Sequence, residues 1–523
     1  MNKWKTKNPS LDQTKLVEEI YKQRGVLDYK ELFSLNEEDL HDPYLLKDMD
    51  KAVKRIVLAI KNNERILIYG DYDVDGITST FIMYKVIKLM GGNVDFDIPN
   101  RFIDGYGLST SKTFDIINDE YKLVITVDNG IKSIDEARIL KENKVDLIIT
   151  DHHEKETELP DAFAIIHTDL SDYPFKPLAG VGVAFKVAQA LIGDEALEYI
   201  DIAALGTIAD MMPLVEENRA IVNMGLKKLK NSSNIGLSQL LDFLEVDKPS
   251  VSDVQYKIAP RINSCGRMKS AKLAVDLLNS ESDKEALSHI LEIEEMNNRR
   301  KKLTKTLYNE ALESVDHDKD AIIIHSPKMH EGVIGIVASR LANEFSKVSV
   351  VLKEEDYTYK GSIRSYNGVD VISILNEIKD LLIRHGGHQN AAGLEFKREN
   401  LEEFKNRFNE LVPNAQKADS TIAEGSIDIY KLGIDQIADL DHYDLKDAVF
   451  LFEGIVPHNK YLIRGEHTKL IISHDVEAIF FSNKALYQNL YRNKVVNLLG
   501  RLDINTYQGR SKKQILIDDY DIQ

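Results

Sequence analysis

The sequence predicts an α/β protein with a mainly parallel first sheet, a second and smaller α/β unit, and a β-rich C-terminal part. Short apolar runs rich in β-branched residues alternate with helical segments between residues 66 and 167. This alternation is typical of a parallel sheet that is covered on both faces. A similar pattern returns over residues 321–396. After about residue 415 short strands with polar turns dominate, which is compatible with a small OB-type barrel.

Five apolar runs are expected to form the first sheet. They are Ile66–Gly70, Val94–Ile98, Leu123–Asp128, Val145–Asp151 and Ala162–His167. Helical segments such as ITSTFIMYKVIKLM and IDEARILKENK separate several of them. Ligands of such sheets bind beyond the carboxyl ends of the strands, so we expect the functional residues at that edge.

Most of the remaining chain before the second α/β unit has a helical pattern. Residues 1–60 are predicted to form helices with polar connections, and residues 202–278 are mostly helical. Residues 280–315 form a long, highly charged stretch, which fits either a solvated helix or a connector between two lobes.

The composition is that of an ordinary globular chain, and 523 residues suffice for about three domains. The single cysteine, Cys265, excludes an intramolecular disulfide and favours a reducing compartment. The N-terminus lacks an apolar signal segment, and no run approaches the roughly 18 apolar residues of a membrane helix. We therefore expect a cytoplasmic protein with no membrane partner.

The net charge of −18 argues against a polyanion as partner, because bulk charge governs long-range steering. Two considerations weaken this argument. Carboxylates that bind divalent metals are not free negative charge, and a local basic groove can exist on an acidic protein. The charge balance alone therefore leaves a nucleic-acid partner open.

The segment GDYDVDG places Asp71, Asp73 and Asp75 at alternate positions before Gly76. A calcium loop with this spacing also needs a bidentate glutamate at its twelfth position and a helix on each side. The twelfth position counted from Asp71 is Ile82, and a predicted strand precedes the segment. A calcium loop is thus excluded, whereas a metal cluster or a solvated acidic turn remains.

Two later predicted strands end in similar residues. Asp128 occurs in VDNG, and Asp151, His152 and His153 occur in TDHHE. Carboxylates gathered within a few Å repel one another unless a cation compensates them. Oxygen-rich sites with one imidazole suit Mn²⁺ or Mg²⁺. The ligands are numerous enough for two ions, an arrangement that activates water and clamps a phosphoryl group.

These motifs, with several others, resemble those of the DHH phosphoesterase superfamily. DYDVDG, VDNG, TDHHE and GTIADMMPL occur in the superfamily's order, and GSIRS and RHGGHQNAAG resemble its associated substrate-binding domain. Together with RFIDGYG, LAGVGVAFK, APRIN and the β-rich C-terminus, they make the chain similar to the RecJ-type single-strand-specific 5′→3′ exonucleases. The tripeptide DHH is weak by itself, but six motifs in register are specific.

The resemblance implies a division of the chain into five segments. They are an N-terminal helical segment (1–60), a DHH catalytic domain (61–280), a connector helix (281–317), a DHH-associated substrate-binding domain (318–414) and an OB-fold-like nucleic-acid-binding domain (415–523). His167-Thr168 stands where Asn-Pro is common in the family, so the turn after that strand is expected to differ.

The resemblance also implies two divalent ions, Mn²⁺ or Mg²⁺. One ion would be held by Asp71, Asp73 and Asp128, and the other by Asp75, Asp128, His152 and Asp210. Asp128 would bridge the ions, Asp151 would orient His152, and His153 would lie beside the scissile phosphate as an electrophile or general acid. Judged on sequence alone, Asp210 is more typical of a helix cap than of a metal ligand.

On the substrate side, the resemblance assigns Arg101 to the DNA 5′ phosphate and Tyr106 to stacking on the terminal base. Ser362 and Arg364 match residues that help to hold that phosphate, a task for which a hydroxyl and a forked guanidinium are suited.

Further candidate contacts to the nucleic acid lie in the later segments. Gly386, Gly387 and His388 match a glycine-rich phosphate-contacting loop, and Arg261 and Arg267 are candidate contacts to backbone phosphates. Additional basic or aromatic candidates are Arg299, Arg300 and Lys301 on the connector and Tyr507, Arg510, Lys512 and Lys513 in the final barrel. Locally basic elements of this kind would reconcile the net negative charge with a DNA substrate.

The implied activity is metal-dependent removal of 5′-mononucleotides from the 5′ end of single-stranded DNA, in DNA repair and recombination. A single-strand-binding protein and a helicase are possible partners, and the chain is expected to be a monomer. A phosphodiesterase of short oligoribonucleotides or cyclic dinucleotides is the alternative, but such relatives typically lack a C-terminal barrel. A catalytically inactive DNA-binding scaffold is a third hypothesis. The retention of every metal-ligand position argues against it.

Overall fold

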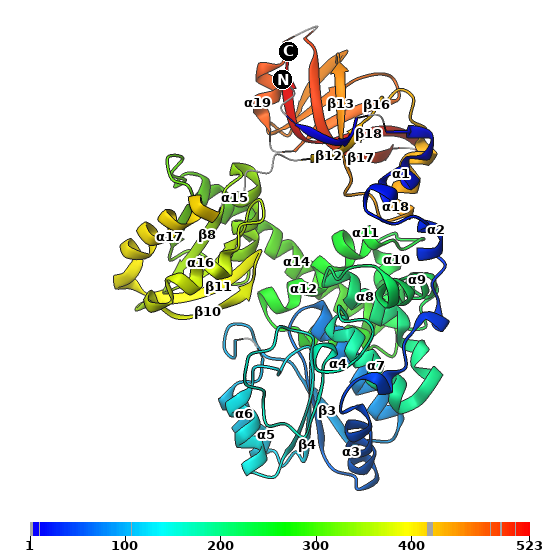
Figure 1. Cartoon of the computed structure of the whole chain (residues 1–523), viewed down its shortest axis with the longest axis vertical. Coiled ribbons are helices and arrows are strands. Elements are labelled where there is room, and N and C mark those ends of the chain that lie inside the picture. The colour runs from blue at the N-terminus through cyan, green and yellow to red at the C-terminus, as the bar shows by residue number, and fades with distance from the viewer. Residues whose placement is uncertain are drawn as a thin grey trace. The chain divides into compact units, whose positions relative to one another are not determined.

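The computed structural model describes residues 4–9, 11–105, 107–415, 422–481, 483–491, 494–507 and 509–523. The chain divides into two compact units (Figure 1). The larger unit comprises residues 35–249 and 253–418, and the smaller comprises residues 1–34, 250–252 and 419–523.

The first sheet of the larger unit has five parallel strands in the order β3-β2-β4-β5-β6. Their bounds are β2 Ile66–Tyr69, β3 Val94–Asp97, β4 Leu123–Val127, β5 Asp146–Thr150 and β6 Ala164–Ile166. The expected parallel α/β sheet is confirmed. β3 and β4 lie on opposite sides of β2, so the direction in which successive strands are added reverses once, between β2 and β4. Ligands of open parallel sheets bind at such a reversal.

Helices cover both faces of this sheet. α5 (Thr110–Asn118) and α6 (Ile134–Glu142) share a buried core with alternate residues of the strands. On the other face lie α3 (Met49–Lys61), α4 (Val74–Leu89) and α7 (Gly180–Ile192), as Figure 1 shows. α8 (Ile200–Ala209) packs on α4 and α7, so α4 is buried along most of its length.

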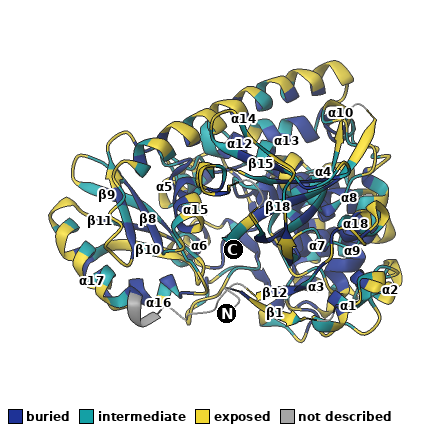
Figure 2. Cartoon of the chain, turned by 90° about the horizontal axis from the view of Figure 1, so that it is seen from above, coloured by how far each residue is buried: buried dark blue, intermediate teal, exposed yellow. Residues whose placement is uncertain are grey.

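A single 30-residue helix, α14 (Asp283–Leu312), forms most of the charged stretch. It contacts α10 (Ile235–Phe243), α12 (Ala259–Met268) and α13 (Lys272–Leu278), and also α15 (Ile334–Phe345) of the second α/β domain. Exposed residues recur along it (Figure 2). α14 is therefore both a partly solvated helix and a connector. Within the described parts of the chain, no helix has the length and apolarity needed to cross a membrane.

The second sheet of the larger unit has the order β10-β11-β9-β8-β7. Its strands are β7 Ile322–Ser326, β8 Ser349–Glu354, β9 Thr358–Arg364, β10 Leu382–His388 and β11 Ala391–Lys397. α16 (Val371–Glu377) and α17 (Leu401–Ala415) lie against one face, and α15 with the end of α14 against the other.

The register of this sheet brings several predicted phosphate-binding residues to one end. Ser362 of β9 is opposite Gly393 of β11, and Gly393 is opposite Gly386 of β10. Arg364 and His388 both pair with Ala391. The glycine-rich segment, expected to be a loop, is therefore mostly the strand β10, because its backbone pairs regularly with β11.

The smaller unit contains an eight-stranded sheet in the order β1-β12-β13-β17-β18-β16-β15-β14. Most pairs are antiparallel, and β1/β12, β12/β13 and β16/β18 are parallel. The strands are β1 Lys5–Asn8, β12 Ile422–Ser426, β13 Val449–Ile455, β14 Asn459–Ile463, β15 His467–Ile471, β16 Val476–Phe480, β17 Val496–Tyr507 and β18 Arg510–Ile522. α1 (Leu16–Gln23), α18 (Ile434–His442) and α19 (Lys484–Asn489) complete this unit's core.

The N-terminal segment differs from the expected helical segment of residues 1–60. Residues 5–8 form β1, which pairs with β12, and residues up to 34 belong to the smaller unit. Trp4 is buried, and its Nε1 donates a hydrogen bond to Asp519 Oδ2 at 2.9 Å. The sequence KTKN has no apolar alternation, so only its pairing with a strand more than 400 residues later makes it a strand.

We expect Trp4→Ala to loosen the β1–β12 pairing, because it removes a buried indole and its hydrogen bond. Truncating a buried tryptophan typically costs about 3 kcal/mol or more. Hydrogen exchange of the full chain, followed by mass spectrometry, should show faster exchange in β12 but not in β2 of the other unit. Trp4→Phe keeps a buried ring and should have a smaller effect. Unchanged β12 exchange in Trp4→Ala would show that β1 does not support the sheet.

Candidate active site

Three aspartates of the candidate site lie in the connection between β2 and α4. Asp71 is buried just beyond β2, Asp73 accepts a hydrogen bond from the N–H of Gly76 at 3.1 Å, and Asp75 lies in the first turn of α4. The alternate spacing arises because the strand end, the helix cap and the first helical turn each contribute one carboxylate. A helix N-terminus favours anionic groups, since its first N–H groups lack partners within the helix.

Asp75 is held by a second helix N-terminus. Its carboxylate accepts hydrogen bonds from the N–H groups of Gly180 and Val181, each at 2.7 Å, where α7 begins. A Cβ on Gly180 would lie 2.4 Å from Asp128 Oδ1, so only glycine allows this close approach. The motif LAGVGVAFK, which had no assigned role, thus supplies donors to the acidic cluster.

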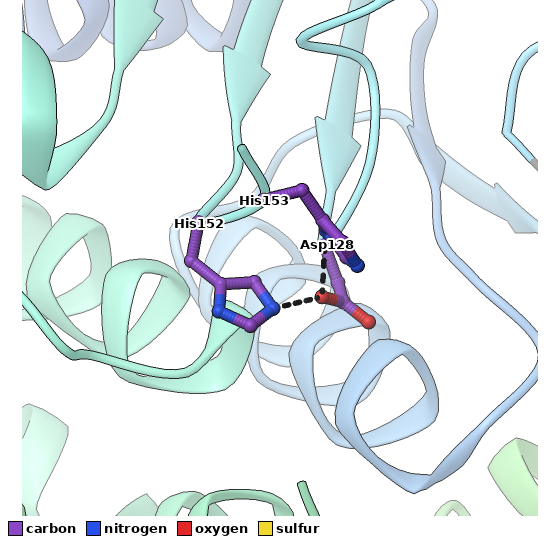
Figure 3. A group of neighbouring side chains, drawn as sticks. All are labelled: Asp128, His152 and His153. Carbon is purple, nitrogen blue, oxygen red and sulfur yellow. Dashed lines mark ion pairs between the residues drawn. The ribbon is translucent and has the colours of Figure 1, made fainter. Parts of the chain in front are cut away.

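Asp128 follows β4 and has a φ of +62°, in the left-handed region that few non-glycine residues adopt. His152 Nε2 lies 3.2 Å from Asp128 Oδ1, 3.6 Å from Asp75 Oδ2 and 3.8 Å from Asp210 Oδ2. Figure 3 shows the side chains of His152 and His153 next to each other, with both paired to the same oxygen of Asp128, Oδ1. One imidazole is thereby shared among three carboxylates from different elements.

Asp151 organises the loop that follows β5. Its Oδ1 accepts hydrogen bonds from the backbone N–H groups of His152 and His153, at 2.8 and 3.1 Å, and lies 2.8 Å from His153 Nδ1. Its Oδ2 accepts a hydrogen bond from the N–H of Ile131 at 2.9 Å. Asp151 therefore orients the ring of His153, not that of His152 as expected. The carboxylate folds back over its own loop, as aspartates in turns do.

His167 holds the other side of the same loop. Its Nδ1 accepts a hydrogen bond from the N–H of Asp169 at 3.1 Å, so Nε2 carries the proton and donates to the carbonyl of His153 at 2.8 Å. His167 is fully buried. The peptide groups of His153 are thus bound by Asp151 on the N–H side and by His167 on the C=O side. The residue that departs from the family's Asn-Pro supports the site.

Asp210 is at once a helix cap and a member of the cluster. It is the residue at which α8 ends, as its sequence suggested, and its side chain is half-buried. Because α8 packs along α4, this end of the helix lies close to Asp75 and His152.

The side chains form groups that fit divalent cations. In each of three groups the ligand atoms lie within 4.8 Å of one another: Asp71, Asp73 and Asp128; Asp75, His152 and Asp210; and Asp128, His152 and His153. The first group is one of the two expected ligand sets, and the second group is the other expected set without Asp128. Asp71 Oδ1 is buried and has no hydrogen-bond partner among the described residues. Oxygens with one or two imidazole nitrogens suit Mn²⁺ or Mg²⁺.

Without a cation, this cluster is electrostatically unfavourable. Burial and the charge of Asp73 raise the pKa of Asp75 to about 7, and burial with the charge of Asp75 raises the pKa of Asp210 to about 8. The same causes raise the pKa values of Asp71 and Asp128 well above their usual range. The protein thus gathers carboxylates that resist ionisation unless positive charge is supplied.

The two histidines differ in charge. Burial lowers the pKa of His152 to about 3, which keeps its ring neutral and able to ligate a cation. Burial would lower the pKa of His153 as well, but its hydrogen bond to the charged Asp151 raises it to about 9. Burial would raise the pKa of Asp151, yet the bond and charge of His153 hold it below its usual value. His153 is therefore a cation beside the acidic cluster, and in this charge state its ring cannot serve as a metal ligand in the third group.

A group of arginines lies close to this centre. On β9, the Arg364 guanidinium donates hydrogen bonds to Ser362 Oγ and to the carbonyl of Ile363, both at 2.8 Å. Burial and the charge of Arg101 lower the pKa of Arg364. Burial and the charges of Arg101, Arg300 and Arg364 lower the pKa of Arg267 to about 10. Such mutual repulsion of cations is relieved when an anion binds among them.

The two domains of the larger unit meet at this point. The ring of His388, on β10, is stacked on the ring of His153 with centroids 6.2 Å apart and planes inclined by 20°. Gly387 has a φ of +140°, and a Cβ there would lie 2.3 Å from the carbonyl oxygen of Ala391. The predicted residues Ser362, Arg364, Gly386, Gly387 and His388 therefore lie at the sheet end that faces the acidic cluster.

Comparison with known proteins gives the site a family context. The chain matches the DHH family, N-terminal domain, over residues 65–207, the DHHA1 domain over residues 318–414 and the RecJ OB domain over residues 443–519. It is 35% identical to the single-stranded-DNA-specific exonuclease RecJ of Bacillus subtilis, over 99% of this chain and 70% of that protein. The chain belongs to the RecJ family.

Two further RecJ relatives match nearly the whole chain, and a third matches about seven tenths of it. The exonuclease RecJ of Salmonella typhimurium is 31% identical over 97% of this chain and 96% of its own. The crystal structure of RecJ from Thermus thermophilus in complex with Mn²⁺ has a TM-score of 0.81 at 28% identity, over 97% of this chain and 75% of that chain. A crystal structure of exonuclease RecJ bound to manganese has a TM-score of 0.64 at 34% identity, over 71% of this chain and 97% of that chain.

Not every residue predicted to contact nucleic acid is available for this. Arg261 Nε is paired with Glu294 Oε2 at 2.7 Å, so its charge is compensated within the protein. Lys513 is buried and donates hydrogen bonds to the carbonyls of Ile429 and Leu432, so the expectation that it contacts DNA is wrong. In the sequence, Lys513 looks like an exposed basic residue near a hairpin turn. In the structure, its side chain points into the protein interior. Tyr106 lies outside the described residues.

We expect the metal-free protein to lose stability as the pH rises from about 4, the ordinary pKa of an aspartate, to about 8. The pKa values of Asp75 and Asp210 are raised in the folded protein, to about 7 and about 8, so each carboxylate binds its proton more tightly when folded. This contribution to stability is fully present below about pH 4, and it is lost between that pH and the raised pKa values of the folded protein. Because divalent ions replace the protons, the increase in melting temperature on adding Mn²⁺ should grow over the same range, as calorimetry can measure.

Two variants control this experiment. Asp210→Asn is nearly isosteric and neutral, so it should flatten the pH dependence. Asp135→Asn, on the exposed part of α6, should leave it unchanged. A Mn²⁺-induced increase that is the same at pH 5 and pH 8 would contradict the protonation of the cluster.

Proposed function

We propose that the protein is a metal-dependent exonuclease that degrades single-stranded DNA in the 5′→3′ direction to 5′-mononucleotides. The observation that carries this is the juxtaposition of the acidic cluster with the arginine group, through the contact of His153 with His388. The acidic cluster would bind the scissile phosphate and the arginine group the terminal phosphate, and these two phosphates are neighbours at one end of a DNA strand. Relatives that match nearly the whole chain are named single-stranded-DNA-specific exonucleases.

The acidic cluster would hold the metal ions. Asp71, Asp73 and Asp128 form one expected set, and Asp75, Asp128, His152 and Asp210 form the other. Bound divalent ions supply a nucleophilic water and stabilise negative charge on the phosphoryl group. In this chain α4, α7 and the loop after β5 fix the ligands, so that the carboxylates are oriented before any ion arrives.

His153 would act on the phosphate directly. Its Nδ1 is held by Asp151, and its raised pKa keeps the ring protonated at neutral pH. The protonated Nε2 would then donate a hydrogen bond to a phosphoryl oxygen and so stabilise the negative charge that develops in the transition state. Asp151 and His167 serve this step by fixing the ring and the backbone of His153.

The arginine group would bind the 5′ end. Arg101, Ser362 and Arg364 provide a cationic, hydroxyl-bearing site that suits a terminal phosphate. Arg267 would contact the next part of the backbone, whereas Arg261 would contribute only by releasing Glu294. Gly386 and Gly387 would let the DNA strand approach β10 closely, and Tyr106 would stack on the terminal base.

The domain division and the partners follow from the same proposal. Residues 61–280 would be catalytic, 281–317 the connector and 318–414 substrate-binding, while residues 415–523 together with 1–34 would form the nucleic-acid-binding unit. Exposed Tyr507 and Arg510 at the β17–β18 turn are its candidate contacts. We further propose a cytoplasmic monomer that acts in DNA repair and recombination, with a helicase and a single-strand-binding protein as partners.

We expect Asp128→Ala to lower the rate of degradation of 5′-labelled single-stranded DNA with Mn²⁺ by at least about 100-fold, because Asp128 belongs to both expected ligand sets and lies 3.2 Å from His152 Nε2. Asp135→Asn is the control for an exposed aspartate of the same domain. Equal degradation by Asp128→Ala would refute the metal mechanism. A preference for dinucleotides over long strands would favour the oligoribonucleotide or cyclic-dinucleotide alternative, against which the matched OB domain argues.

Recognition of the 5′ phosphate gives a second prediction. A hydrogen bond to a charged group contributes about 1.5–3 kcal/mol, so removal of the 5′ phosphate should slow the wild type by roughly 10-fold or more. Arg364→Ala should degrade both substrates at the same low rate. Arg398→Ala, which removes an arginine paired with Glu354 in the same domain, should keep the preference. An unaltered preference in Arg364→Ala would count against this assignment.

A further inference from the structure

Tyr72 lies between Asp71 and Asp73, and neither the expected ligand sets nor the expected substrate contacts include it. Its ring is half-buried, and the guanidinium carbon of Arg101 lies 5.2 Å from the ring centroid. A cation over an aromatic face at this distance is attracted by the electron-rich face of the ring. The one residue thus touches both halves of the site: its backbone carries the metal loop and its ring supports the arginine.

The position of Tyr72 is fixed by α12. A Cβ on Gly266 would lie 2.5 Å from the carbonyl oxygen of Tyr72 and 3.1 Å from its Cβ, so helix and loop are in close contact. Two residues after Tyr72, the N–H of Val74 donates a hydrogen bond to Oδ1 of Asn263 in α12, at 3.2 Å. The ring therefore projects from a backbone that is locked against a helix.

Arg101, in contrast, lies in the connection between β3 and α5. That connection is held by local hydrogen bonds, from the N–H of Asn100 to Asp104 Oδ2 and from the N–H of Phe102 to Asn100 Oδ1. Phe102 also makes an edge contact with His330, with centroids 5.5 Å apart. These contacts fix the turn but not the end of the long Arg101 side chain, which is repelled by Arg267 and Arg364. The Tyr72 ring opposes that repulsion.

We propose that Tyr72 is a positioning residue that couples the metal centre to the 5′-phosphate site, by holding the Arg101 guanidinium against a ring fixed to the metal loop. This inference rests on the proposed function and deepens it. The aromatic face is what acts, since the contact of Arg101 is with the ring. The consequence is that Tyr72 contributes to the discrimination between 5′-phosphorylated and 5′-hydroxyl strands by acting through Arg101.

The test compares Tyr72→Phe with Tyr72→Leu in the full chain with Mn²⁺. The readout is the ratio of kcat/KM for a 5′-phosphorylated over a 5′-hydroxyl single strand. Tyr72→Phe keeps the aromatic face and should keep the ratio within about twofold. Tyr72→Leu should lower it by about 3- to 30-fold, the range that cation–π energies give. In an Arg101→Ala background, Tyr72→Leu should cause no further change.

Metal affinity separates positioning from general damage to the loop. The Mn²⁺ concentration for half-maximal activity should stay within about twofold in Tyr72→Leu, because Gly266 and Asn263 hold the backbone independently of the ring. The inference is overturned if Tyr72→Leu keeps the full ratio, if Tyr72→Phe loses as much as Tyr72→Leu, or if the Mn²⁺ requirement rises while the ratio stays. Absence of nuclease activity in the wild type would refute the proposed function itself.

Discussion

The mutual repulsion of buried carboxylates at one edge of a parallel sheet is the constraint on which the rest of the active site depends. Asp71, Asp75 and Asp128 are buried beside one another. A fold can tolerate this only if it supplies compensating dipoles and leaves room for cations. The N-termini of α4 and α7 provide the dipoles, and the absence of a side chain at Gly180 lets α7 approach the Asp128 carboxylate closely.

The neighbouring positive group is built on the opposite principle. Arg101, Arg267 and Arg364 repel one another, and burial strengthens the effect. An acidic centre that requires cations thus lies next to a basic centre that requires an anion. A phosphodiester strand end with metal ions satisfies both at once, which is why a chain with a net charge of −18 can act on a polyanion. His153 lies between the two centres. It is positively charged like the arginines, but it belongs to the loop that carries the metal ligand His152.

Much of this was accessible from the sequence, because strand ends are local features. An apolar run followed by Asp71, Asp128 or Asp151 identifies the carboxyl edge of a parallel sheet without any knowledge of the strand order. Contacts that depend on how two elements pack were not accessible. Asp151 holds His153 instead of the His152 ring, His167 supports the same loop, and Lys513 turns inward. Each outcome depends on a few Å of packing that residue types do not encode.

By itself the sequence determined the α/β class, the edge at which the site lies and the residue types that form it, since periodicity and strand termini are properties of short segments. Only the tertiary structure decided that β1 completes a sheet with β12, that α7 donates to Asp75, and that the Tyr72 ring lies beneath Arg101. These contacts join segments far apart along the chain. Their energies come from burial and close packing, which exist only once the whole fold has brought the segments together.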